Sequence, residues 1–331
     1  MSNKKRIQCA IAALLFVAVS LFAGCKKETQ PESIKLNVAY FPNITHAQSL
    51  VMKSQGTLEK INENCVVTWT AFNAGPAEIE ALFAGEIDIG YIGPVPAING
   101  YVNSNGDLKI IAGATNGGSV LVAGEGSSIA SVADLANKKV AVPQFGNTQH
   151  LSLLDLLSSN NLSPTSAGGT VNVIQASNAD IPNLMEQKEL DAALVPEPWG
   201  SILELEHGCK LVLDYDQISA DDIPGTAVVI VRKDYLAEHR DIVEAFIKAH
   251  KEATDYINGN TEQAKKIIKA EIETATGSSF SDAVMDSAFK RLVVTYDIPE
   301  YSISMFAELN LQEKFNEKAP DGQLIANEFI G

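Results

Sequence analysis

The sequence contains few arginines and few cysteines, and it lacks the common catalytic and nucleotide-binding motifs. The chain has four arginines, and three of them follow residue 25: Arg232, Arg240 and Arg291. There is no G-x-S-x-G, no P-loop and no H-E-x-x-H, and the five histidines are not spaced as metal ligands. These absences argue against enzymes of those classes and against a metal site, and we expect no cofactor.

Positive charge is also scarce relative to negative charge. The 331 residues include 41 Asp and Glu but 25 Lys and Arg, so the net charge is −16. An acidic chain has little general affinity for nucleic acid or for an anionic membrane surface. With 46% hydrophobic and 20% charged residues, the composition is that of a folded globular protein, and the length allows two domains.

The first 24 residues have the pattern of a secretory signal. Basic residues at 4–6 precede an apolar run over 9–23, which is too short for a typical transmembrane helix. The run ends in FAGC, which is similar to a bacterial lipobox with Phe in place of the usual Leu. We predict a lipoprotein signal peptide over 1–24, a lipidated Cys25 and a polar tether over 25–33. An ordinary signal peptide or an uncleaved anchor is the alternative.

Two further cysteines, Cys65 and Cys209, each begin a strand-like run, CVVTWTAF and CKLVL. A disulfide between them would link two distant parts of the chain. Two separate buried thiols are the simpler interpretation, because a free cysteine packs as a small apolar side chain.

One pattern occurs twice in the chain. It reads AEIEALFAGEIDIGYIGPVPAI over 77–98 and ADIPNLMEQKELDAALVPEPWGSI over 179–202, with Asp88 and Asp191 at corresponding places. Upstream segments extend both copies, so that each reads β-α-β-α-β-α. The expected strands are 35–41, 64–72 and 89–92 in the first copy and 138–143, 170–176 and 192–195 in the second. Short buried strands that alternate with helices predict two parallel sheets, each covered by helices on both faces.

Two segments are expected to cross between the lobes that the copies form. Residues 108–124 predict two strands around an Asn-Gly-Gly turn, and residues 221–233 predict the return strand. The expected lobes are 34–116 plus 228–331 and 117–227, with the two crossings as a two-segment hinge. The helical pattern from about 237 to 316 predicts helices that pack on the first lobe.

The loops after the strands contain the candidate binding residues. Right-handed crossovers place these loops on one edge of each sheet, where α/β folds bind ligands. No arginine lies in the loops, so an anion has to be held by uncharged donors and by backbone N–H groups at helix N-termini. The candidates are Asn43, Thr45, His46, Asn73, Gln144, Asn147, Thr148, Gln149 and Asn178, with the loop backbone at Gly75, Gly93 and Pro94.

Several of these candidates also have a purely structural interpretation. Asn73 and Asn178 are well placed to cap the helices that follow them, and Thr148 is another possible cap. His46 can simply belong to the first turn of a helix. For these four residues, ligand contact and a structural role both remain open.

Three larger side chains near the strand ends are also ambiguous. Trp199 can form a wall of the cleft, because an aromatic face suits an alkyl chain or an ammonium group, or it can belong to the core. Glu197 can receive an ammonium group of a ligand, or it can form a structural salt bridge. Trp69 lies in the middle of an expected strand and is assigned to the core.

The chain resembles the substrate-binding proteins of ABC importers, in the branch that binds aliphatic sulfonates, taurine and nitrate. The resemblance covers nearly the whole chain after residue 34 and rests on FNAGPAEIEALFAGEIDIGYIGPVPAINGY, IIAGATNGGSVLV, VADLANKKVAVPQFGNTQ and NADIPNLMEQKELDAALVPEPWGSIL. It implies the type II periplasmic-binding-protein fold, two doubly wound α/β lobes with a ligand cleft that closes by hinge rotation. It also implies an ABC permease and its ATPase as partners of a monomer that is lipid-anchored outside the cytoplasm of a bacterium.

The resemblance leaves the ligand open. A small sulfonate-type anion, an alkanesulfonate or taurine, is the first expectation, and nitrate, bicarbonate or a pyrimidine precursor of thiamine is the alternative. A tethered ligand sensor without a transporter is a further reading. A pyrimidine-synthase-like enzyme shares this fold, but the chain has no cysteine-rich active-site motif of that kind, and an export signal argues against it.

Overall fold

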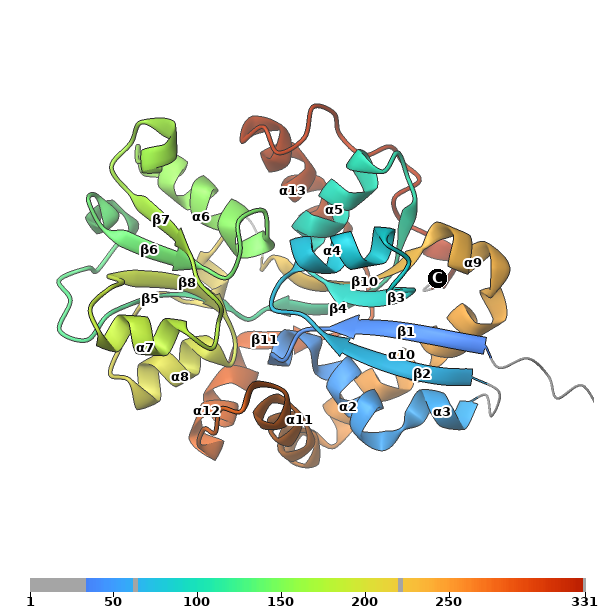
Figure 1. Cartoon of the computed structure of the whole chain (residues 1–331). Coiled ribbons are helices and arrows are strands. Elements are labelled where there is room, and N and C mark those ends of the chain that lie inside the picture. Colours follow the sequence, from blue (N-terminus) through green and yellow to red (C-terminus); the bar gives the residue numbers. More distant parts are fainter. Residues whose placement is uncertain (1–33, 62–64, 220–222, 330–331) are drawn as a thin grey trace, which may run out of the picture. The chain divides into compact units, whose positions relative to one another are not determined.

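Two β-sheets form the framework of the chain (Figure 1). The computed structural model describes residues 34–61, 65–219 and 223–329, so the expected signal peptide, Cys25 and the tether lie outside the described residues. Both sheets belong to one compact unit, Lys35–Gly331. Within the described ranges, no helix is both long enough and apolar enough to span a membrane.

The first sheet has six strands in the order β2-β1-β3-β10-β4-β11. β1 and β3 are parallel, β10 lies antiparallel between β3 and β4, and β11 is antiparallel to β4. We call this sheet, with the helices connected to it, lobe 1. The strands are β1 (Ile34–Tyr40), β2 (Cys65–Ala71), β3 (Ile89–Ile92), β4 (Leu108–Gly117), β10 (Gly225–Arg232) and β11 (Leu292–Val294). The helices are α2 (Ala47–Gln55), α3 (Thr57–Ile61), α4 (Gly75–Phe83), α5 (Pro94–Asn103), α9 (Lys233–Glu238), α10 (Arg240–Gly259), α11 (Thr261–Thr276), α12 (Asp282–Ala288) and α13 (Glu300–Gln312).

The second sheet has five strands in the order β7-β6-β8-β5-β9. β6 is parallel to β7 and to β8, whereas β5 is antiparallel to β8 and to β9. This sheet and its helices form lobe 2. The strands are β5 (Ser119–Ala123), β6 (Lys139–Val142), β7 (Asn172–Gln175), β8 (Ala192–Pro196) and β9 (Lys210–Leu213), and the helices are α6 (Thr148–Ser159), α7 (Ile181–Glu186) and α8 (Trp199–Glu206).

The repeat in the sequence is confirmed as a repeat in the fold. The order β1-α2-β2-α4-β3-α5 in lobe 1 corresponds to β6-α6-β7-α7-β8-α8 in lobe 2, and the strands lie side by side as β2-β1-β3 and β7-β6-β8. The expected parallel pairing is confirmed for β1 with β3 and for β6 with β7 and β8, but both sheets are mixed. Each sheet adds an antiparallel strand next to the third strand of its copy, β10 next to β3 and β5 next to β8. These added strands come from the segments that cross between the lobes.

The two repeated aspartates have matching structural roles. Asp88 accepts hydrogen bonds from the backbone N–H of Asn37 at 2.8 Å and from its side-chain amide at 2.9 Å, and Asn37 lies in β1. Asp191 accepts a hydrogen bond from the backbone N–H of Lys139 at 2.8 Å, at the start of β6. Each carboxylate therefore joins the loop before one parallel strand to the neighbouring strand. The repeated Asp therefore helps to assemble each sheet. It does not belong to the loops that follow the strands.

The two crossings are hydrogen-bonded to each other. Gly117 and Gly118 have φ of +73° and +77°, the left-handed region that glycine adopts without strain, so the chain can turn sharply from β4 into β5. The N–H of Gly117 donates to the carbonyl of Pro224 at 2.8 Å, and the hydroxyl of Thr226 donates to the carbonyl of Gly117 at 2.5 Å. β10 begins at Gly225, so lobe 1 takes up the return crossing slightly before residue 228.

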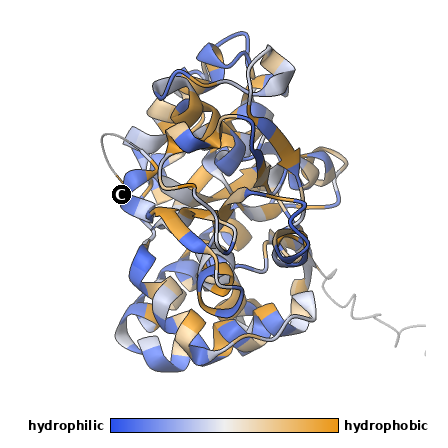
Figure 2. Ribbon diagram, turned by 90° about the vertical axis from the view of Figure 1, so that its left-hand side faces the viewer, coloured by the Kyte–Doolittle hydropathy of each residue, from blue (hydrophilic) through white to orange (hydrophobic). Residues whose placement is uncertain are grey.

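The helices of the C-terminal third cover lobe 1, with one exception. α10 and α11 pack on α2, and α13 packs on α5, as expected. α12 packs on α8 of lobe 2 as well as on the 3-10 helix Phe289–Arg291 that leads into β11, so its contacts are not confined to lobe 1 as expected. Figure 2 shows hydrophobic residues gathered in the strands and hydrophilic residues along the outer helices. Cys65 and Cys209 are free and buried, which confirms two separate thiols.

Candidate functional site

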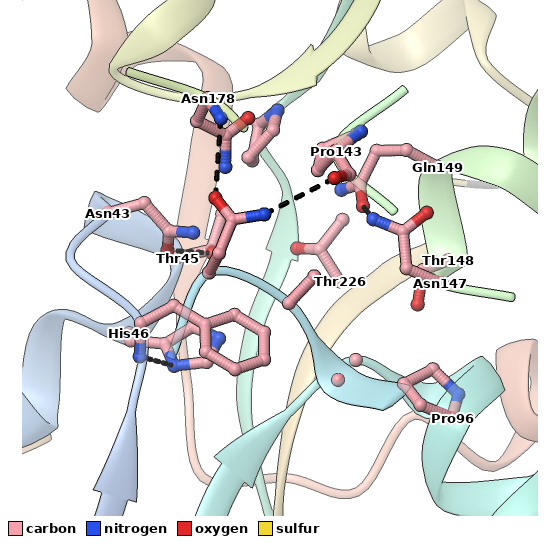
Figure 3. A pocket seen from close by; sticks show the side chains of 16 residues that line it. Asn43, Thr45, His46, Pro96, Pro143, Asn147, Thr148, Gln149, Asn178 and Thr226 are labelled. Carbon is pink, nitrogen blue, oxygen red and sulfur yellow. Dashed lines mark hydrogen bonds between the residues drawn. The ribbon is translucent and has the colours of Figure 1, made fainter. Parts of the chain in front are cut away.

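A small polar cavity lies between the lobes, at the loops that follow the parallel strands (Figure 3). Its volume is about 20 Å³, room for about one water molecule. The lobes are closed on each other, because hydrogen bonds cross from one to the other beside the cavity. The lining residues come from both copies of the repeat and from β10. They are Phe41, Asn43, Thr45, His46, Asn73, Ala74, Gly75, Gly93, Pro96, Pro143, Asn147, Thr148, Gln149, Asn178, Pro196 and Thr226.

The lobe 1 wall is built by the turn after β1. Residues 44–46 form a short 3-10 helix, and the hydroxyl of Thr45 donates to the side-chain oxygen of Asn43 at 2.6 Å. The N–H of Phe41 donates to Nδ1 of His46 at 3.0 Å, and the two rings stack with their centroids 4.3 Å apart. Burial lowers the pKa of His46 to about 3. The ring is therefore neutral at physiological pH, and its proton is on Nε2, which leaves that nitrogen as a donor.

The lobe 2 wall is the first turn of α6. Asn147 is the N-cap, and its side-chain oxygen accepts a hydrogen bond from the N–H of His150 at 2.8 Å. Its amide group donates to Oε1 of Gln149 at 3.0 Å, and the amide of Gln149 donates to the hydroxyl of Ser119 at 3.0 Å. These hydrogen bonds fix both amides, while Thr148 lines the cavity and its hydroxyl lies near the N–H of Val95 in lobe 1.

Polar contacts join the two walls across the cavity. The side-chain amide of Asn73 donates to the carbonyl of Pro143 at 3.2 Å, and its oxygen accepts from the N–H of Asn178 at 3.3 Å. The N–H of Val95 approaches the hydroxyl of Thr148 at 3.4 Å. Of the two interpretations left open for Asn73 and Asn178, the role as helix caps is not the one that the structure shows. The caps of α4 and α7 are Ala74 and Asp180, and Asn73 connects the lobes instead.

Among the described residues, no Asp, Glu, Lys or Arg lines the cavity, and Glu197, the residue after Pro196 of its wall, is held in an ion pair. Arg291 binds Glu197 at 2.8 Å, Glu204 at 2.5 Å and Asp214 at 2.9 Å, and so connects the segment before β11 with lobe 2. Glu197 is fully buried, and its second oxygen accepts from the N–H of Ser201 at 2.9 Å. Burial raises the pKa of Glu197, and Arg291 acts in the opposite direction. Of the two roles considered for Glu197, the structure shows the salt bridge. Glu197 does not line the cavity.

Ten of the candidate residues from the sequence line the cavity. They are Asn43, Thr45, His46, Asn73, Gly75, Gly93, Asn147, Thr148, Gln149 and Asn178. Four others do not: Pro94 begins α5, Gln144 lies in the loop before α6, Glu197 turns to Arg291, and Trp199 lines a neighbouring pocket. Direct contact of any of these residues with a ligand stays a prediction.

Six lining residues were not among the candidates from the sequence. Five of them, Phe41, Ala74, Pro96, Pro143 and Pro196, lie beside candidates in the same loops, so the loops themselves were the signal. Thr226 is different, because it lies in the return crossing and not in a strand-to-helix loop. In the described part of the chain, no group of three or more His, Cys, Asp or Glu is arranged to hold a metal ion.

Several curated proteins are similar to this chain. The taurine-binding periplasmic protein of Escherichia coli (strain K12) is 28% identical over 240 residues, which cover 72% of this chain and 68% of that protein. A putative aliphatic sulfonates-binding protein of the same strain is 30% identical over 211 residues, 63% of this chain and 62% of that protein, less than two thirds of its length. A putative aliphatic sulfonates-binding protein of Bacillus subtilis (strain 168) is 26% identical over 261 residues, 76% and 75% of the two chains.

Solved structures show the same fold. The alkanesulfonate-binding protein SsuA from Xanthomonas axonopodis pv. citri, bound to MOPS, superposes with a TM-score of 0.74 at 19% identity, over 90% of this chain and 99% of that one. The nitrate-binding protein NrtA from Synechocystis PCC 6803 superposes with a TM-score of 0.66 at 15% identity, over 88% and 85%. The fold is therefore that of the periplasmic binding proteins. A family model described as the NMT1-like family matches residues 29–272, and the chain belongs to that family.

Proposed function

We propose that this chain is the extracytoplasmic solute-binding component of an ABC importer, and that it binds a small sulfonate-type monoanion by closure of its lobes. An alkanesulfonate or taurine is the expected ligand. The observation that carries the proposal is the closed cavity lined by uncharged hydrogen-bond donors from both lobes. The names of the taurine-binding and sulfonate-binding relatives support it.

The chemistry of the cavity suits a weakly basic anion. Hydroxyl, amide and imidazole donors surround the space, and the N-termini of α4 and α6 point their free N–H groups and positive dipole ends toward it. A carboxylate or phosphate is usually held by a bidentate arginine. The three arginines of the described chain are engaged elsewhere, with Arg291 and Arg232 in ion pairs and Arg240 near Glu244.

Closure connects binding to transport in this proposal. The two lobes rotate about the crossings at Gly117-Gly118 and at the start of β10. A ligand that bonds to both walls stabilises the closed state because it interacts with both walls only there. The closed form then docks on a permease with its ATPase. Cys25 carries the lipid that keeps the protein at the outer face of a bacterial membrane.

The small volume of the cavity favours one second candidate. Nitrate and bicarbonate are planar and compact, and they need less expansion of the closed cavity than a pyrimidine ring does. A pyrimidine precursor, a tethered sensor and a pyrimidine-synthase-like enzyme receive no support from a specific contact in the cavity. We therefore keep nitrate and bicarbonate as the second candidate.

Calorimetric titration of the full-length protein in a non-ionic detergent tests the proposal. The panel is methanesulfonate, butanesulfonate, taurine, nitrate, bicarbonate and an aminopyrimidine. A ligand present at 100 times its Kd also adds about 2.7 kcal/mol to the free energy of unfolding, which a thermal-shift scan detects. Binding of sulfonates, weakened in Thr148→Val, supports the proposal. Binding of the aminopyrimidine alone, with no response to any anion, refutes it.

A further inference from the structure

A second pocket lies beside the cavity and has a different character. Its volume is about 300 Å³, at the lower end of the range for small-molecule sites. Apolar groups dominate its walls, among them Pro42, Phe72, Trp199 and Ala275. We call it the side pocket. It is formed by the loops after β1 and β2, the start of α8 and the end of α11, so it also spans the two lobes.

Three asparagines separate the side pocket from the cavity. Asn43, Asn73 and Asn178 line both spaces, so their side chains form the partition. Asn73 closes the partition with two hydrogen bonds, one of 3.2 Å to the carbonyl of Pro143 and one of 3.3 Å from the N–H of Asn178. These distances are at or beyond the long end of the normal range, and Asn73 is exposed to solvent. Both hydrogen bonds are therefore weak, and rotation of this amide breaks them at little energetic cost.

One group in the partition already lacks a partner. Asn178 is buried, with 5% of its surface exposed, and its side-chain oxygen has no hydrogen-bond partner in the described chain. A buried polar atom without a partner is unfavourable unless a ligand or water completes it. An amide can present its NH₂ group instead after rotation about its last torsion, and it can then donate to an anion.

Neither space offers a partner for a charged tail. Among the described residues, no Asp, Glu, Lys or Arg lines the cavity or the side pocket, and His46 is neutral. Glu197, the acidic residue nearest in the sequence to Trp199, is held by Arg291. An ammonium group that entered the side pocket would lose part of its water without gaining a carboxylate, and contact with the ring of Trp199 would offset only some of that loss.

We propose that the side pocket is the subsite for the tail of an organosulfonate, and that the protein prefers sulfonates with an uncharged alkyl or aryl tail over taurine. This inference rests on the proposed function, because it needs the anionic head in the cavity. The head bonds to the donors of both walls. The tail passes between Asn73 and Asn178 and packs against Phe72 and Trp199.

A series of sulfonates with tails of increasing length tests the preference. Each methylene removed from water contributes about a fourfold gain in affinity when fully buried. We therefore expect hexanesulfonate and benzenesulfonate to bind at least tenfold more tightly than methanesulfonate, and taurine to bind more weakly than propanesulfonate. The measurement is calorimetric titration of the full-length protein in a non-ionic detergent.

A substitution that fills the side pocket separates the tail from the head. Ala275 lies on its rim near the end of α11 and is exposed, so Ala275→Phe occupies the pocket without touching the cavity. The matched control is Ala270→Phe, at an exposed alanine of the same helix that does not line the pocket. We expect Ala275→Phe to weaken hexanesulfonate at least fivefold and to leave methanesulfonate unchanged. Ala270→Phe should change neither.

The outcomes distinguish this inference from the proposed function. If methanesulfonate binds but longer tails add no affinity, or if taurine binds best, the tail subsite is refuted while sulfonate binding stands. If Ala275→Phe weakens every sulfonate equally, the pocket does not hold the tail. If no sulfonate binds at all, the proposed function fails first and this inference fails with it.

Discussion

Gly93 provides a direct test of whether the lobes close as described. Its backbone, with φ of −68° and ψ of 149°, is acceptable for any residue, so Gly93→Ala introduces no backbone strain. A Cβ atom at this position would lie 2.3 Å from the hydroxyl oxygen of Thr148, whereas ordinary contacts begin at 3.4 Å. Gly93 belongs to lobe 1 and Thr148 to lobe 2. A small opening of the cleft therefore relieves the contact, and the fold of each lobe is unaffected.

The expected effect of Gly93→Ala is on affinity and not on folding. Overpacking of this kind typically costs about 1–3 kcal/mol. If this energy is lost only in the closed state, the Kd for methanesulfonate rises by a factor of about 5–150. The unliganded protein should unfold within about 0.5 kcal/mol of the original, because opening removes the clash. Calorimetric titration gives the Kd, and urea denaturation gives the free energy of unfolding.

A second glycine supplies the contrast. A Cβ at Gly200 would lie 2.1 Å from a methyl group of Val120, and both residues belong to lobe 2. No opening of the cleft relieves that contact, so Gly200→Ala should lower the free energy of unfolding. A double-mutant cycle of Gly93→Ala with Thr148→Ala completes the test, because removal of the hydroxyl should reduce the penalty. Unchanged affinity in Gly93→Ala would refute closure of the lobes against this glycine.

Three further predictions concern buried titratable groups. The carboxyl of Glu78 is fully buried without a hydrogen-bond partner in the described chain, and burial raises its pKa well above 4.5. The free energy of unfolding relative to Glu78→Gln should therefore be highest below pH 4.5. Above pH 4.5 it should fall by about 1.4 kcal/mol per pH unit, up to the folded-state pKa. Urea titrations at several pH values measure this difference, and a constant difference would contradict burial of the acid. Arg291→Met should cost about 3–5 kcal/mol because it leaves Glu197 buried and unpaired, and Glu197→Gln in the same chain should restore part of it; additive losses in denaturation would contradict the pairing. Because burial lowers the pKa of His46 to about 3, the Kd of an anion should not tighten between pH 8 and pH 6, and a marked tightening in calorimetry would show a charged imidazole.

The order of the elements could be predicted because it depends on local patterns. The β-α-β repeat, the Asn-Gly-Gly turn and the end of α10 near Asn260 all follow from residues close together in the sequence. The loops that line the cavity follow in turn, because parallel strands bring their carboxyl ends to one edge. The mixed character of the sheets could not be predicted in the same way. It depends on where β5 and β10 insert, which is a choice among distant partners.

The directions of side chains limit how much of the site can be predicted from the sequence. Pro196 and Glu197 are neighbours after β8, but Pro196 lines the cavity and Glu197 points to an arginine 94 residues away in the sequence. The local sequence does not contain that partner. Asn73 looked like a helix cap because of its position, yet its partners Pro143 and Asn178 belong to the other lobe. In each case the decisive contact is between segments that only the tertiary fold brings together.

The lack of charge in the cavity is itself a basis for selectivity. The energy needed to remove an ion from water rises with the square of its charge, so a dianion such as sulfate loses about four times as much hydration energy as a monoanion of similar size. A cavity with arginine or lysine would repay that loss, but neutral donors repay only a part of it. The cavity here has only neutral donors, and His46 does not become cationic until the pH falls to about 3. Under the proposed function, we therefore expect the cavity to stabilise a monoanion with a low proton affinity best and to disfavour abundant dianions without any steric barrier against them.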